Sequence, residues 1–219
     1  MTAPATSIAT ATRTPRPERF FSLSRLKRAL LLPAAALTLG LAGCTSLPQA
    51  PGASQPTGPV AVDLPRYMGR WYVIANVPYF AEKGMVGSRS EWILRSDGIT
   101  IDDHYYGRSK RFDAPEEHHQ FLDTVVEGSG GGEWSVKLWG PIHARQVTLW
   151  VDPQYRYTLV GVRGTKWGWV FSREPLMDDA TYQSLLKRFA ALGYDASSFR
   201  RVPQRPEDIG QPGFQNPND

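Results

Sequence analysis

The sequence is poor in cysteine: Cys44 is the single cysteine among 219 residues. One thiol excludes an intrachain disulfide, and the rest of the chain holds no cysteine for a metal cluster or for a thiol nucleophile. The apolar segment 29–41 is also shorter than the roughly 20 residues that a membrane-spanning helix requires. The folded part must therefore be held together by its hydrophobic core.

Cys44 follows this apolar segment and ends the run Leu-Ala-Gly-Cys, after a basic cluster at residues 25–28. This order resembles the lipobox of a bacterial lipoprotein, in which the secretory signal is removed. Residues 1–43 would then be lost, and a lipid on Cys44 would attach the protein to a membrane. The alternative is a chance cysteine in an apolar segment. Because Thr45 rather than aspartate follows the cysteine, we expect an outer-membrane lipoprotein that faces the periplasm.

The basic charge of the full chain belongs mostly to this predicted signal. The full sequence has 25 Lys and Arg against 21 Asp and Glu, a net charge of +4. Six basic residues and one acidic residue precede Cys44, so the mature chain carries 19 basic and 20 acidic residues. Nucleic-acid binding needs a basic patch on the folded domain, and this composition gives it no support.

Composition divides the mature chain into three regions. Residues 44–60 are rich in Pro, Gly, Ser and Ala, which predicts a flexible tether. Residues 61–202 are dense in aromatic and β-branched side chains, which predicts one folded domain. Residues 203–219 contain four prolines and little apolar content, which predicts a disordered tail.

Within the folded region, apolar stretches recur about every 10–12 residues between turn signals, which predicts an all-β fold. Short links favour an antiparallel up-and-down sheet, and eight strands can close into a barrel with room for one small ligand. A helix capped by Asp178 or Asp179 and ended by Gly193 should pack outside it, before a short strand at Phe199–Val202. The eight predicted strands are Gly69–Val77, Val86–Arg95, Gly98–Tyr106, His118–Glu127, Glu133–Trp139, Arg145–Val151, Tyr155–Val162 and Trp167–Arg173.

This order of elements resembles the lipocalin family, and bacterial outer-membrane lipocalins in particular. Three signatures in order carry the resemblance: the G-x-W run at Gly69 and Trp71, Asp152 with Tyr155 before the seventh strand, and Arg173 at the end of the eighth. The resemblance implies a binding protein for a small hydrophobic ligand, a fatty acid or a lysophospholipid, with no cofactor and no metal. Homodimers occur in the family, so a dimer is possible here.

The physical role of the signature residues can be stated separately. Gly69 lacks a Cβ, so the chain can bend tightly at the barrel floor. Trp71 points to the same face of its strand and can close that end of the barrel. The guanidinium of Arg173 could stack on the Trp71 indole in a cation–π contact worth about 0.5–2 kcal/mol. We therefore interpret all three residues as structural rather than as ligand contacts.

Large side chains on one face of several strands predict an apolar cup above this floor. An acyl chain would be held there by burial, at roughly 0.8 kcal/mol per methylene. Ordinary core packing is the alternative for each aromatic residue. The residues expected to line the cup are Trp92, Tyr105, Trp134, Val136, Leu138, Tyr157 and Trp169.

Two other classes of function stay open at this point. The first is an enzyme on the same barrel, an isomerase or hydrolase that uses Asp103 and His104 for acid–base chemistry. The second is a scaffold protein whose barrel is filled by its own side chains. We expect His118 and His119 to lie in a solvated acidic loop rather than in a metal site, which would need convergent ligands from elsewhere.

Overall fold

The protein is described here by a computed structural model that covers residues 58–217. The predicted signal, Cys44 and most of the predicted tether lie outside the described residues. Among residues 58–217, no helix is long and apolar enough to cross a membrane. The main elements are α1 (Leu64–Tyr67), β1 (Gly69–Asn76), β2 (Met85–Leu94), β3 (Thr100–Ser109), β4 (Glu116–Val125), β5 (Glu133–Trp139), β6 (Ile142–Val151), β7 (Tyr157–Val162), β8 (Gly168–Ser172), α2 (Asp179–Ala191) and β9 (Arg200–Arg201).

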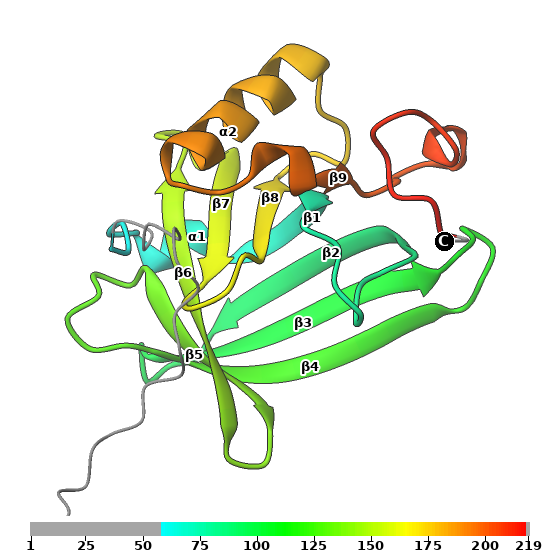
Figure 1. Cartoon of the computed structure of the whole chain (residues 1–219). Helices are drawn as coiled ribbons and strands as arrows, with labels where there is room; N and C mark the ends of the chain where they lie inside the picture. Colours follow the sequence, from blue (N-terminus) through cyan, green and yellow to red (C-terminus); the bar gives the residue numbers. More distant parts are fainter. Residues whose placement is uncertain (1–57, 218–219) are drawn as a thin grey trace, which may run out of the picture. The chain divides into compact units, whose positions relative to one another are not determined.

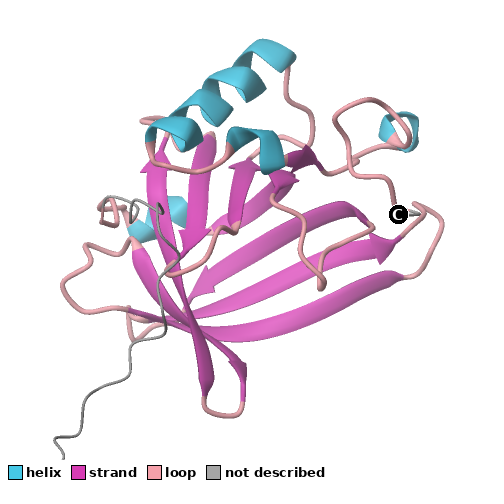
Figure 2. Cartoon of the chain, viewed as in Figure 1, coloured by secondary structure: helices cyan, strands magenta, loops and turns pink. Residues whose placement is uncertain are grey.

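The sheet is an antiparallel barrel with up-and-down connections (Figures 1 and 2). The strand order is β2-β3-β4-β5-β6-β7-β8-β1-β9, and an additional pairing of β1 with β2 closes the barrel. Each strand from β1 to β8 pairs with its neighbours in sequence, as short links require. The predicted eight-stranded barrel is confirmed.

Helix α2 covers the outside of the barrel over β6, β7 and β8 (Figure 1). Asp178 caps it, because a carboxylate oxygen accepts a hydrogen bond from the backbone N–H of Thr181 at 2.8 Å. One face of the helix, with Leu185 and Phe189 at its centre, packs on the outward side chains of these strands. The chain leaves the helix at Gly193, whose φ is +86°. The predicted cap, stop and placement are therefore confirmed.

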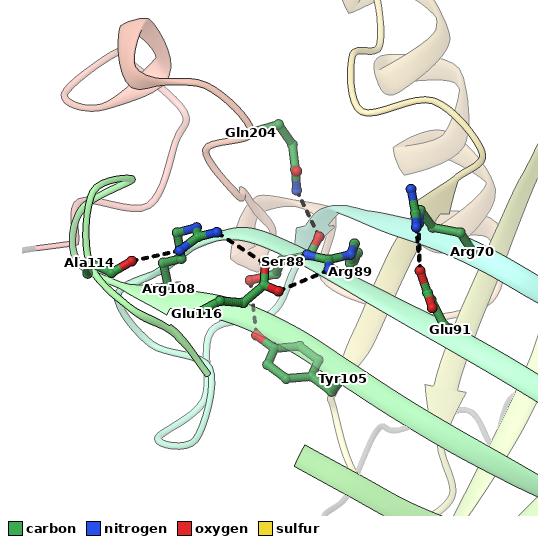
Figure 3. A network of polar contacts seen from close by, with 9 residues as sticks. All are labelled: Arg70, Ser88, Arg89, Glu91, Tyr105, Arg108, Ala114, Glu116 and Gln204. Carbon is green, nitrogen blue, oxygen red and sulfur yellow. Dashed lines mark hydrogen bonds and ion pairs between the residues drawn. The ribbon is translucent and has the colours of Figure 1, made fainter. Parts of the chain in front are cut away.

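The hairpin of β3 and β4 is longer than its sequence indicated. Strand β4 begins at Glu116, two residues before the predicted start at His118, so the acidic residues Glu116 and Glu117 belong to the strand and do not form the acidic loop expected around His118 and His119. Arg89 of β2 explains the extension, because its guanidinium makes two hydrogen bonds to the Glu116 carboxylate, at 2.7 and 3.2 Å (Figure 3). Arg108 also reaches Glu116, at 3.4 Å, and thereby ties three strands together at this end.

An aromatic cluster, the floor, fills the end of the barrel next to α1. It consists of Tyr67, Trp71, Trp92 and Trp134, each at most 1% exposed. The Trp71 indole N–H donates to the backbone carbonyl of Tyr67 at 2.8 Å, and the Tyr67 and Trp92 ring centroids are 5.2 Å apart. Gly69 has a φ of +92°, a conformation that other residues rarely adopt, so the chain turns there from α1 into β1.

Arg173 joins the floor to three parts of the chain. Its guanidinium lies 3.7 Å from the centre of the Trp71 ring, in the cation–π contact expected from the sequence. The same group donates to the carbonyls of Arg70 at 2.7 Å and Arg66 at 2.9 Å, and its Nε donates to the carbonyl of Tyr155 at 3.3 Å. One side chain therefore holds α1, β1 and the turn before β7 in place.

The segment 203–217, here called the strap, corrects the prediction of a disordered tail. The Gln204 side-chain amide donates to the carbonyl of Val73 at 2.8 Å and to that of Ser88 at 3.1 Å. Figure 3 shows the bond to Ser88. The pairing of β1 with β2 ends at Tyr72 and Arg89, so these bonds bridge the seam where the two strands separate. Proline content indicated an absence of regular structure, but side-chain hydrogen bonds order the segment instead.

Replacing Arg173 with alanine is expected to destabilise the fold by about 2–3 kcal/mol, because several charge-assisted hydrogen bonds and one cation–π contact are lost together. Thermal or urea unfolding of the purified domain measures the change. Arg173→Lys keeps the positive charge but loses the planar guanidinium, so its stability should lie between those of the wild type and Arg173→Ala. A variant with unchanged stability and weakened ligand binding would instead assign Arg173 to the ligand site.

Candidate functional site

Above the floor the barrel encloses a cavity of about 240 Å³, here called the cup. Aromatic and aliphatic side chains from the inner faces of β2 to β8 make most of its wall, together with the loop between β1 and β2. A hollow interior separates this barrel from one filled by its own side chains. The lining residues are Tyr79, Ala81, Glu82, Ser90, Trp92, Asp103, Tyr105, His119, Phe121, Val136, Leu138, Ala144, Gln146, Val162, Trp167, Trp169 and Phe171.

Five of the seven residues expected to line the cup do so. Leu138 is 49% exposed and lies at its rim. The other four, Trp92, Tyr105, Val136 and Trp169, are each more than nine-tenths buried.

The remaining two expected residues lie elsewhere. Trp134 belongs to the floor, where its indole N–H donates to the Gly131 carbonyl at 2.8 Å. Tyr157 is on the outer side of β7 and packs with the cluster under α2, whereas Val160 of the same strand packs inside. Alternation along β7 accounts for this difference, because residues 157 and 160 differ by an odd number and point to opposite faces.

Sequence reasoning missed the loop between β1 and β2, which supplies Tyr79 and Glu82 to the cup. The Glu82 carboxylate accepts hydrogen bonds from Asn76 Nδ2 at 2.6 Å, from Trp169 Nε1 at 2.9 Å and from the Tyr79 hydroxyl at 3.1 Å. Burial raises the pKa of Glu82, and the three donors act in the opposite direction. The sequence signal was weak: two aromatic residues, Tyr79 and Phe80, in a loop where polar residues are usual.

A second missed feature is a pair of buried carboxyl groups on adjacent strands. Asp103 of β3 is directly opposite Phe121 of β4, and Asp123 is opposite Ile101. The two carboxyl groups therefore share the inner face as diagonal neighbours, a relation in which Cα atoms are about 7–8 Å apart. Asp103 is 8% exposed and Asp123 is fully buried.

These two carboxyl groups differ from Glu82 in having little hydrogen bonding. Within residues 58–217, Asp103 Oδ1 and both side-chain oxygens of Asp123 are buried without a hydrogen-bond partner. Burial raises the pKa of both groups well above the ordinary aspartate value, into the neutral range. The indole of Trp92 favours the ionised form of Asp103, whereas the charge of Asp103 further raises the pKa of Asp123.

The acid–base pair of the enzyme alternative is not assembled. Asp103 points into the barrel, and His104, the next residue on β3, points outward. There His104 Nδ1 lies 2.9 Å from His118 Nε2, and the His118 ring stacks on Tyr106 with centroids 4.5 Å apart. The described part of the chain also has no group of three or more His, Cys, Asp or Glu placed to hold a metal ion.

Comparison with known proteins agrees with this geometry. Residues 62–204 match the sequence family described as "Lipocalin-like domain". The chain belongs to the lipocalin family. Lobster apocrustacyanin A1 has a similar fold, with a TM-score of 0.52 at 16% identity over 70% of this chain and 94% of that one.

Curated lipocalins extend the comparison to sequence. Temperature-induced lipocalin-1 of Arabidopsis thaliana is 28% identical over 160 residues, which cover 65% of this chain and 80% of the relative. Outer membrane lipoprotein Blc of Vibrio cholerae serotype O1 is 26% identical over 168 residues, which cover 75% of this chain and 93% of the relative. The chain therefore spans most of the length of these lipocalins.

The carboxyl pair predicts an unusual dependence of stability on pH. The folded state holds protons on Asp103 and Asp123 that the unfolded state has already lost at about pH 5, because folding raises both pKa values. The free energy of unfolding should therefore fall as pH rises from about 5 to about 8, by on the order of 3 kcal/mol. Urea unfolding at several pH values measures it.

Asp103→Asn and Asp123→Asn should each flatten this dependence and raise stability near pH 8. Asp102→Asn is the matched control, because Asp102 is the neighbouring residue on the outer face and is paired with Arg95. A wild-type stability that does not fall over this range would contradict the buried pair.

Proposed function

We propose that this lipocalin is a membrane-tethered binding protein that holds one single-chain hydrophobic ligand in its cup. Fatty acids and lysophospholipids, the classes expected from the sequence, are the first to test. The observation that carries the proposal is the hollow, mostly apolar interior above a sealed floor. A site of this kind holds its ligand by burying apolar surface and orients it with a few polar groups.

The size of the cup supports a ligand with one chain. Its volume of about 240 Å³ is below the 300–1,000 Å³ typical of pockets for drug-sized molecules. One alkyl chain can enter between the aromatic walls, whereas two acyl chains of a phospholipid exceed the space. Trp92, Trp167 and Trp169 line the cup, so ligand binding should change the intrinsic fluorescence of the protein.

Attachment to the outer membrane is the second part of the proposal. Its support is the lipobox at Cys44 and the name of the Vibrio cholerae relative, an outer membrane lipoprotein. A binding domain tethered to a bilayer can exchange ligand with that bilayer and avoids transport of an apolar molecule through water. This arrangement suits storage or transfer of lipid-like molecules within the bacterial envelope.

Delipidated protein is expected to bind a single-chain fluorescent lipid probe with micromolar affinity, about −8 kcal/mol. Ala144→Phe should weaken binding at least tenfold, because Ala144 lines the cup and the added ring occupies ligand space. His143→Phe is the matched control on the outer face of the same strand, and it should bind like the wild type. Absence of tryptophan quenching by any probe from a broad panel would contradict a ligand-binding function.

Growth of the native bacterium, or of an enterobacterial host, on labelled palmitate is expected to label the protein. Label should sediment with the outer membrane after density separation, because the lipid is attached to Cys44. Cys44→Ala should abolish labelling and leave the precursor unprocessed, while the separately expressed domain keeps its ligand binding. Unlabelled wild-type protein would contradict the anchor without affecting the proposal for the cup.

A further inference from the structure

We propose that the cup selects a ligand whose buried end is a cationic nitrogen, a protonated amine or a quaternary ammonium group, in preference to one that ends in a carboxylate. This inference rests on the proposed function and names the head-group chemistry of the same site. It assigns the cationic end to the deep part of the cup and the alkyl chain to its mouth.

The depth of the carboxyl pair follows from strand register. Gly69, next to the floor, pairs with Trp92, and Trp92 in turn pairs with Asp103. Asp123 lies still closer to the sealed end, because it pairs with Ile101 and Val136. The deep wall of the cup therefore contains the Asp103 carboxyl group, and Asp123 is buried next to it outside the lining.

The Asp103 carboxyl group has an acceptor that a ligand could use. Asp103 is more than nine-tenths buried and lines the cup, and in the described chain its Oδ1 accepts no hydrogen bond. A buried acceptor without a partner destabilises the folded protein, and a donor supplied by a ligand removes that cost. An ammonium group brings several donors and a positive charge to this position.

The lining contains nothing that could neutralise a ligand carboxylate deep in the cup. Among the residues described, no lysine or arginine is in the lining. The guanidinium of Arg173, at the floor, directs its donors to backbone carbonyls outside the cup. A fatty-acid carboxylate at depth would therefore lie against Asp103, with Asp123 buried beside it and no counter-charge, which is costly in a buried site.

The walls also suit a cation. Trp92, Trp167 and Trp169 line the cup with Tyr79 and Phe171. Tyr79 and Trp167 lie close together, with ring centroids 4.9 Å apart, and Trp92 and Phe171 are 5.4 Å apart. Aromatic faces attract a desolvated ammonium group, so these walls add to the attraction of the Asp103 carboxyl group.

Binding of a cation to this pair should be linked to release of a proton. Burial keeps a proton on the pair near neutral pH, and a permanent positive charge in its place favours the ionised form. The other titratable groups that face the cup are Glu82, Tyr79 and Tyr105, with His119 at the mouth. The linkage distinguishes a cation in contact with the pair from simple apolar burial.

The experiment compares four ligands with the same decyl chain on the delipidated domain: decyltrimethylammonium, decylamine, decanol and decanoate. Tryptophan fluorescence and calorimetry at about pH 8 measure each dissociation constant. We expect the two cationic ligands to bind about tenfold more tightly than decanol, and decanoate to bind more weakly than decanol. Affinity for decyltrimethylammonium should rise as pH increases from about 6 to about 8, while that for decanol stays constant.

Variants locate the effect. Asp103→Asn should remove most of the preference for cations and most of the pH dependence, and Asp102→Asn on the outer face should keep both. Calorimetry of the wild type in buffers of different ionisation enthalpy measures the released proton directly and needs no variant.

The outcomes separate this inference from the proposed function. If decanol binds and decanoate binds at least as tightly as the cationic ligands, the proposed selectivity is wrong. The cup would then be a hydrophobic binding site without a preference for cations. Cationic ligands that bind tightly without proton release, or equally well to Asp103→Asn, also overturn it. If none of the four ligands binds, and the single-chain fluorescent lipid probe does not bind either, the proposed function itself is wrong.

Discussion

The rest of the structure depends on the contact between Arg173 and Trp71 at the sealed end of the barrel. A closed eight-stranded sheet has an interior that must be plugged at one end if the other is to stay hollow. The guanidinium covers the Trp71 ring from outside and binds carbonyls of α1, of β1 and of the turn before β7. With the floor fixed in this way, the strands above it do not need to fill the cup with their own side chains.

Near the mouth, the barrel is closed by a segment outside the sheet and not by pairing of β1 with β2. Strands β1 and β2 separate beyond Tyr72, and the strap bridges them through Gln204. The bridge reaches Ser88, whose carbonyl accepts from Gln204 and whose hydroxyl accepts from the hydroxyl of Tyr105, a residue of the cup, at 3.0 Å (Figure 3). Side chains of the cup and the C-terminal segment are thus joined through one residue, so the strap belongs to the binding domain.

Much of this arrangement could be predicted from sequence because it depends on residues that are close together in the chain. Alternation and turn residues located all eight strands, and β5 was predicted at its observed bounds, Glu133–Trp139. The inward side of β7 could not be predicted, because apolar residues occupy both faces: the outer face packs under α2. The strap was missed because Gln204 and Gln215 act through a few long-range side-chain hydrogen bonds, which leave no periodic signal.

The carboxyl pair escaped prediction for a related reason. In the sequence, Asp102 and Asp103 are equivalent, but in the strand one pairs with Arg95 on the surface and the other is buried in the cup. Apolar residues at positions 103 and 123 would be expected to give a more stable barrel, because buried carboxyl groups with few hydrogen bonds are costly. Such costs concentrate where a protein meets its ligand. Asp103 bears this cost in the wall of the cup, with Asp123 beside it, and this is the strongest physical reason to look for the ligand's polar end there.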